Sequence, residues 1–204
     1  MVRVTHIPAT MAHVVELAAT MREADRREIW ASDRQLPLGA LSISLRESER
    51  AWSTFFDDEI AMMYGVRRIP EAEGSMMVWF LSSTVVDRYP ITFWRACKEG
   101  LPKLLEEYPV LCNMVDARYE QSVRWVRRLG FQVKKEEPFG PDGVPFHFVI
   151  RRADANSTGK GAEEGRAQDG SVQEAEKEEG RDDQRSARSI RVRNPSEARL
   201  ETPA

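Results

Sequence analysis

Apolar residues along the first 150 positions recur with periods that switch between two and about 3.6, which indicates alternating strands and helices. The period of two, with turn residues on either side, predicts strands over residues 2–6, 47–56, 60–66, 75–82, 110–115, 131–136 and 146–151. The helical period predicts helices over residues 11–21, 26–31, 40–45, 90–108 and 119–129. This order predicts an α/β or α+β domain whose mixed sheet is covered on its faces.

Residues typical of helix ends and turns define several of these boundaries. Thr10 suits the N-cap of the first helix, and Pro90 suits the first turn of the longest one. The segment 57–59, Asp-Asp-Glu, has the layout of an acidic hairpin turn between two strands. Gly130 is typical of a residue that ends a helix.

The distribution of charge divides the chain into two parts. Residues 1–153 carry 21 acidic and 21 basic side chains, whereas residues 154–204 account for the net charge of −3. The second part has no Phe, Trp, Tyr, Met or Cys, so it cannot bury enough apolar area to offset its conformational entropy. We therefore expect one folded domain over 1–153 and a disordered charged tail over 154–204.

The longest apolar runs reach about six residues, far short of the roughly 20 that cross a bilayer as a helix. We therefore expect no membrane span. The beginning of the chain lacks the apolar core of a secretory signal, and two cysteines, Cys97 and Cys112, are too few for a disulfide framework. A reducing cytosol is the expected location.

Residues 122–131, Ser-Val-Arg-Trp-Val-Arg-Arg-Leu-Gly-Phe, precede a predicted strand and resemble the GCN5-related N-acetyltransferase (GNAT) superfamily, as does the order of elements. Residues 21–29, 78–81 and 111–118 more particularly resemble GNAT-like internal virion proteins of T7-like short-tailed phages and their prophage relatives. The resemblance covers about residues 1–152. It implies a mostly antiparallel central sheet of about six or seven strands flanked by helices, in a protein of the bacterial host cytoplasm that is packaged in the virion.

Active members of the superfamily hold the coenzyme A pyrophosphate with a glycine-rich loop at a helix N-terminus. The corresponding segment here, residues 82–91, contains no glycine, and Asp87 adds a negative charge. The candidates for anion contacts that remain are Ser82, Ser83, Thr84 and Arg88.

The resemblance also implies a tyrosine four residues before the Gly130-Phe131 pair as the acid that protonates the departing thiolate, but Val126 stands there. The candidate that remains is Tyr119, which lies near the start of the helix, about 10 Å away from that position along the helix axis. The candidates for a general base are carboxylates of the hairpin turn, foremost Glu59, and Asp116 at a strand end.

The remaining groups of histidine, cysteine and basic residues favour structural roles. The three histidines share no metal-ligand spacing, and the two cysteines fit no zinc pattern. The densest basic patch of the predicted domain consists of Arg118, Arg124, Arg127, Arg128, Lys134 and Lys135. Such a patch suits nucleic acid, although the zero net charge of the domain favours a solvated helix face.

Two hypotheses follow. In the first, the GNAT scaffold has a degenerate acyl-CoA site, holds no cofactor and serves virion assembly or genome delivery through contacts with other phage structural proteins or host proteins. In the second, the chain is an N-acetyltransferase that uses acetyl-CoA with an atypical phosphate-binding loop. The segment from Ser82 to Pro90 discriminates between them, because only the second requires it to accept phosphates.

Overall fold

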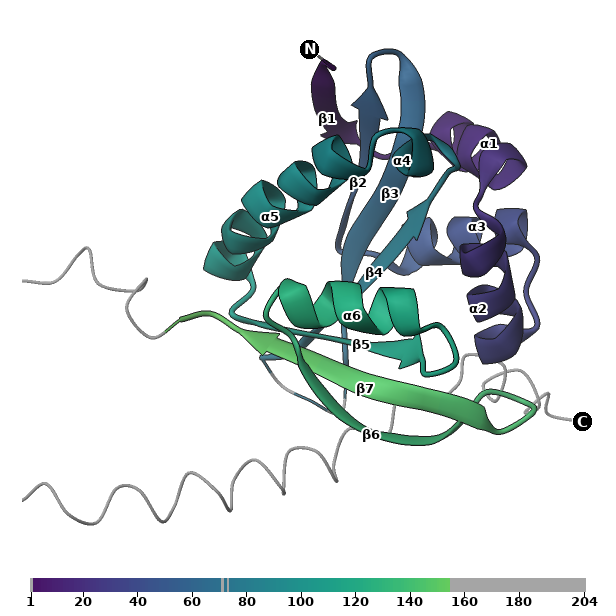
Figure 1. Ribbon diagram of the computed structural model, residues 1–204, viewed down its shortest axis with the longest axis vertical. Coiled ribbons are helices and arrows are strands. Elements are labelled where there is room, and N and C mark those ends of the chain that lie inside the picture. The colour runs from purple at the N-terminus through teal and green to yellow at the C-terminus, as the bar shows by residue number, and fades with distance from the viewer. Residues whose placement is uncertain (1, 71, 73, 155–204) are drawn as a thin grey trace, which may run out of the picture.

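The computed structural model describes residues 2–70, 72 and 74–154, so the predicted tail lies outside the described residues except for Asp154. These residues form seven strands and six helices in the described part of the chain (Figure 1). In chain order the elements are β1 (Val4–Pro8), α1 (Met11–Thr20), α2 (Glu23–Asp33), α3 (Pro37–Glu47), β2 (Arg50–Phe56), β3 (Glu59–Arg68), β4 (Met76–Ser82), α4 (Val85–Arg88), α5 (Pro90–Glu107), β5 (Val110–Asp116), α6 (Glu120–Arg128), β6 (Gln132–Phe139) and β7 (Val144–Arg152).

Local sequence signals account for several helix ends. Thr10 caps α1 by accepting a hydrogen bond from the His13 N–H, and the His13 ring accepts one from the Thr10 N–H in return. Pro90 opens α5, where its fixed φ suits a first helical turn. Gly130 follows α6 with a φ of 84°, a left-handed conformation that glycine adopts without steric cost.

The strands form one mixed sheet in the order β1-β2-β3-β4-β5-β7-β6, in which only the β4/β5 pair is parallel. Two layers of helices cover it. One core cluster packs α1, α2 and α3 against β3 and β4 through residues such as Leu17, Leu41 and Met63. On the opposite face α5 and α6 pack against the sheet through residues such as Leu105 and Val126. The predicted fold class, a mixed and mostly antiparallel sheet flanked by helices, is confirmed.

The two parallel strands in the middle of the sheet diverge. β3 and β4 pair over seven residues, and so do β5 and β7. In contrast, β4 and β5 pair only where Met76 meets Leu111 and Met77 meets Cys112. Beyond those residues the two strands separate, as Figure 1 shows. This split is the feature of the fold that positions the candidate site.

The structure extends some predicted elements and adds one. α2 begins at Glu23 rather than Arg26, and α3 runs over Pro37–Glu47 rather than residues 40–45. As a result, β2 starts at Arg50 and not at Glu47. The short helix α4 was not predicted, because its β-branched valines favour strands and its single turn gives no periodicity. None of the helices in the described residues is long and apolar enough to span a bilayer.

Two glycines provide a matched test of the packing. A Cβ on Gly65 in β3 would lie 2.7 Å from Nε1 of Trp79 and 2.8 Å from the carbonyl oxygen of Arg50 on the neighbouring strand. The strand backbone cannot retreat, so we expect Gly65→Ala to lower the free energy of unfolding by about 1–3 kcal/mol. Urea unfolding of the purified protein measures this loss.

Gly100→Ala is the control for that substitution. A Cβ there meets no atom within 4 Å, and the residue lies inside α5. Alanine in a helix interior is favoured over glycine by roughly 0.5–1 kcal/mol, so this variant should be more stable than the parent chain. Equal effects of the two substitutions would contradict the packing described for Gly65.

Candidate functional site

The split between β4 and β5 leaves part of the β4 backbone without a strand partner. Ser82 directs both backbone groups away from β3: its N–H donates to Asp25, and its carbonyl accepts from the N–H of Arg22. In an antiparallel pair this orientation repeats every second residue. Phe80 therefore directs its N–H and C=O into the split, where an extended ligand can pair with them.

On the facing strand, β5, a side chain provides the acceptor for a backbone N–H. Asn113 of β5 accepts a hydrogen bond from the N–H of Met114 through its own side-chain oxygen, at 2.8 Å. That backbone N–H therefore already has an acceptor. At Phe80, β4 still offers a backbone N–H and a C=O to a ligand.

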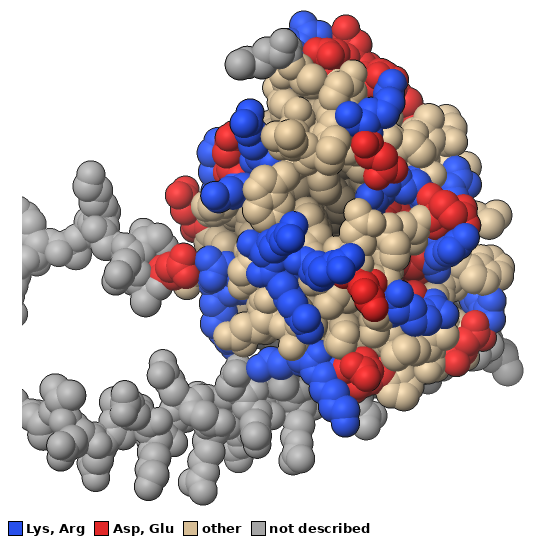
Figure 2. Space-filling view, viewed as in Figure 1, with Lys and Arg blue, Asp and Glu red and all other residues tan. Residues whose placement is uncertain are grey.

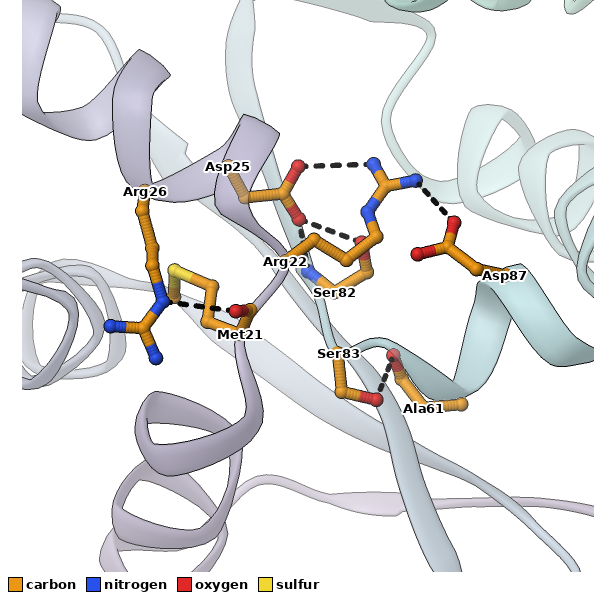
Figure 3. A network of polar contacts seen from close by, with 8 residues as sticks. All are labelled: Met21, Arg22, Asp25, Arg26, Ala61, Ser82, Ser83 and Asp87. Carbon is orange, nitrogen blue, oxygen red and sulfur yellow. Dashed lines mark hydrogen bonds and ion pairs between the residues drawn. The ribbon is translucent and has the colours of Figure 1, made fainter.

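A polar network fixes the far end of β4 to the junction of α1 and α2 (Figure 3). One carboxylate oxygen of Asp25 accepts from the N–H and the hydroxyl of Ser82, both at 2.7 Å. The other accepts from the Arg22 guanidinium at 3.0 Å, which also reaches Asp87 at 3.3 Å. Burial opposes the charge of Arg22, but the two carboxylates outweigh it and raise its pKa. The network holds the end of β4 toward α2 and away from β5.

The four residues predicted to contact an anion have separate places in this region. Ser82 and Ser83 are fully buried; the first hydroxyl donates to Asp25 and the second to the carbonyl of Ile60 at 2.6 Å. Thr84 and Arg88 are exposed, and Arg88 pairs with Glu59 at 2.6 Å. The two serine hydroxyls therefore face the protein interior, and contacts from Thr84 and Arg88 to an anion stay a prediction.

The backbone of the loop between β4 and α5 also differs from an open phosphate cradle. The N–H groups of Val85, Val86, Asp87 and Tyr89 all donate within the segment, for example Val85 to the Ser83 hydroxyl at 3.2 Å. The free donors lie one turn later. Phe93 is bonded to the Tyr89 carbonyl, Pro90 has no N–H, and no side chain in the described residues caps α5. The N–H groups of Ile91 and Thr92 are thus the unpaired donors of a helix N-terminus.

A cleft runs from that helix end along α6 to the split. Pro90 and Phe93 of α5 line one side, and Arg124 and Arg128 of α6 line the other. Figure 2 shows Lys and Arg side chains gathered over α6, next to a hollow in the surface. Neither arginine makes an ion pair with a described acidic residue in the structure. The cleft therefore combines two arginine side chains with a helix N-terminus, which together suit an anion.

Three aromatic rings meet at the inner end of this cleft. Phe80 of β4 lies 5.3 Å from Trp125 of α6 and 5.7 Å from Phe93 of α5, measured between ring centroids. Phe93 and Trp125 stack with an interplanar angle of 11°. We call these residues the aromatic triad. It connects the diverging strand to both helices of this face.

Glu28 of α2 lies at the split and was not singled out from the sequence. It is partly buried and lines the cleft of Arg124 as well as two clefts near α3 and β7. Burial raises the pKa of Glu28 to about 8, and the nearby Asp25 and Asp116 add to the shift. The backbone N–H of Asp116 donates to it, which partly opposes the shift. A carboxyl group poised near neutral pH in a cleft is suited to proton transfer.

The predicted catalytic residues are only partly brought together. Asp116 is buried beside Glu28, but the guanidinium of Arg118 binds it at 2.6 Å. Tyr119 precedes α6 and lines the cleft that holds Glu28. Glu59 stands apart at the start of β3, paired with Arg88. Their catalytic roles stay predictions, while the position of Glu28 between Asp25 and Asp116 depends on contacts that no local pattern reveals.

Among residues 2–70, 72 and 74–154, no group of three or more His, Cys, Asp or Glu side chains could hold a metal ion. Both cysteines are free thiols, and Cys112 is fully buried.

Comparison with known proteins supports the fold and not the narrower resemblance. No protein-family model matches the chain, and no curated protein matches it. Among solved structures, YncA of Salmonella typhimurium with its cofactor acetyl-CoA is similar at 11% identity and a TM-score of 0.54, over 78% of this chain and 99% of that one. An acetyltransferase of the GNAT family from Streptococcus pneumoniae matches at 10% identity and a TM-score of 0.51, over 74% and 99%.

A ribosomal-protein-alanine N-acetyltransferase from Brucella melitensis matches at 15% identity and a TM-score of 0.55, over 72% of this chain and 99% of that one. At such identities the likeness establishes the architecture alone. The chain has the fold of the GNAT acetyltransferases.

Proposed function

We propose that the chain is an N-acyltransferase that takes an acyl group from an acyl-CoA thioester and passes it to an amine. The observation that carries this proposal is the split between β4 and β5, which joins an open backbone edge at Phe80 to an ionisable carboxyl group at Glu28. The cleft leads from that point to a cluster of anion-binding groups. One cleft thus offers places for a phosphate, an extended amide chain and a base.

The residues of the cleft suit coenzyme A if its phosphates lie at a different position from the loop after β4. The loop from Ser82 to Pro90 uses its own N–H groups, so the phosphates would lie instead against Arg124, Arg128 and the N–H groups of Ile91 and Thr92. Asp87 lies 3.3 Å from the Arg22 guanidinium, which reduces its charge in part, because the same guanidinium also binds Asp25. When bound, the cofactor supplies an acyl group activated as a thioester.

Glu28 is the proposed general base. In its ionised form it would accept the proton that an amine loses as its nitrogen attacks a carbonyl carbon. Asp116 would position Glu28 through its backbone N–H, while its own carboxylate is neutralised by Arg118. Tyr119 lines the same cleft and is the proposed donor of a proton to the leaving sulfur.

The second candidate function is a GNAT scaffold without acyl transfer, which acts in a phage particle through contacts with other virion proteins or host proteins. The observation that favours it is the loop after β4, whose buried serines and internally bonded N–H groups leave little for a pyrophosphate. In this hypothesis the basic face of α6 would contact a partner or nucleic acid, and the protein would be made in the host cytoplasm and packaged. Mass spectrometry of purified particles tests that location.

Thermal unfolding with acetyl-CoA separates the two candidates. A ligand at 100 times its dissociation constant stabilises a protein by about 2.7 kcal/mol, which raises the Tm of a domain of this size by roughly 5–11 °C. We expect such a shift for the full chain. Arg124→Ala and Arg128→Ala should each weaken binding roughly tenfold, because each removes a charge-assisted contact to phosphate.

Arg127→Ala is the matched control, since Arg127 lies on the same helix but does not line the cleft. It should leave the affinity nearly unchanged. A chain that shows no shift at millimolar acetyl-CoA would contradict the acyltransferase proposal and favour the scaffold. Equal losses in all three variants would indicate a diffuse electrostatic effect instead of the proposed contacts.

The role of Glu28 predicts a pH dependence of activity. With a pKa of about 8, the base is ionised only at higher pH, so kcat/KM should rise with pH and level off above about 8. Glu28→Gln should lower kcat/KM by 10²-fold to 10⁴-fold and remove that rise, while the affinity for acetyl-CoA is retained. An unchanged pH profile in this variant would exclude Glu28 as the base.

The pH dependence of the stability of the protein reports on the Glu28 carboxyl group independently of activity. The folded pKa lies above the unfolded value of about 4.3, so the folded protein binds more protons between these values and its stability falls as pH rises through that range. Glu28→Gln lacks this loss and should become increasingly more stable than the parent chain from pH 5 to pH 8. Glu16→Gln on α1 is the matched control, because it makes the same substitution at an exposed residue.

A further inference from the structure

An apolar cavity lies between α5, α6 and the sheet, and the function proposed above does not use it. Its volume is about 110 Å³, and its walls are almost entirely hydrocarbon and aromatic. Leu101 and Leu104 of α5, Val126 and Leu129 of α6 and Val78 of β4 form much of the lining. We call it the α5 cavity.

The α5 cavity continues the candidate site. Phe80, Asn113, Trp125 and Val126 line both this cavity and the cleft that holds Glu28. The aromatic triad stands between the two spaces, so the cavity begins where the inner end of the cleft stops. A group attached to a ligand at the Phe80 edge would therefore enter this cavity.

The few polar groups in the lining show that the cavity suits an uncharged occupant. Burial alone raises the pKa of the Cys97 thiol to about 12, and burial is also the main cause that raises the pKa of Tyr64. His6 is bonded to the Thr54 hydroxyl at 2.8 Å, and burial lowers its pKa, so the neutral ring is favoured. A charged ligand would lose its hydration here without gaining an ion pair, whereas a hydrocarbon chain would not.

We propose that the α5 cavity receives the hydrocarbon chain of an acyl group longer than acetyl, so that the donor is a short-chain to medium-chain acyl thioester. This inference rests on the proposed function, because the chain must be carried on a thioester bound in the cleft. An apolar cavity of about 150 Å³ holds benzene, so the present one suits about four to six carbon atoms. An acetyl group would leave most of that volume empty.

Gly100 offers a way to close the cavity without disturbing its walls. It lies among Ala96, Cys97, Leu101 and Leu104 on the face of α5 that lines the cavity, and a Cβ there meets no atom within 4 Å. Gly100→Leu would place a side chain in the empty space. Glu99→Leu adds the same side chain one position away, at an exposed residue that does not line the cavity, and is the matched control.

The test measures dissociation constants of acetyl-, butyryl-, hexanoyl- and decanoyl-CoA for the full-length chain and both variants by calorimetry. Each buried methylene favours binding about fourfold, so affinity should rise about 16-fold from acetyl to butyryl and again to hexanoyl, and then level off. Gly100→Leu should abolish the rise but keep the affinity for acetyl-CoA. Glu99→Leu should keep the whole series.

The possible results distinguish a failure of this inference from a failure of the proposed acyltransferase function. If acetyl-CoA binds and longer chains bind no better, the inference is overturned while the acyltransferase proposal stands. A rise with chain length that Gly100→Leu leaves intact also overturns it, since the chain then lies elsewhere. If no acyl-CoA binds the parent chain, both proposals fail. Melting of the apo variants at the parent temperature or above shows that Gly100→Leu is folded.

Discussion

The candidate site depends on two parallel strands that pair at one end only. β4 and β5 share two residue pairs, and the Arg22–Asp25–Ser82 network then holds the end of β4 toward α2. The aromatic triad fills the space that the divergence opens on the side of α5 and α6. Without this split, the backbone edge at Phe80 would be paired in the sheet, and Glu28 would have no opening into the cleft. The candidate site therefore lies where the pairing of the sheet is interrupted, and the surrounding contacts maintain this interruption.

The electrostatics of the split depend on which of its carboxylates are paired with an arginine side chain. Asp25 binds the Arg22 guanidinium, and Asp116 binds that of Arg118. Glu28 lies between them with burial as the main influence on its charge, which makes its proton easy to gain and to lose near neutral pH. The same arrangement costs stability at high pH, as is common where a group is kept for chemistry. The arginines of α6 contribute a separate field at the other end of the cleft.

The fold could be predicted from the sequence, whereas the arrangement of the candidate site could not, for different physical reasons. Strands and helices follow from local periodicity, and Thr10, Pro90 and Gly130 act through their own backbone or side chain, so these features were visible in the chain. The strand edge at Phe80 and the position of Glu28 arise from tertiary contacts between residues more than 50 positions apart. Ser82 and Ser83 carry hydroxyls suited to anions, yet their burial directs these inward. The absence of glycine from the loop was visible in the sequence, whereas Arg124 and Arg128 were considered only as part of a surface patch.

The most direct measurement of the central claim is a titration of the backbone amide spectrum of the protein with acetyl-CoA. We expect the amide signals of Phe80, Ile91 and Thr92 to shift together, because these N–H groups lie at the split and at the N-terminus of α5. Signals of β1 at the far edge of the sheet should stay unchanged. Shifts confined to other parts of the chain, or none at millimolar ligand, would contradict the claim that the split between β4 and β5 binds an acyl thioester.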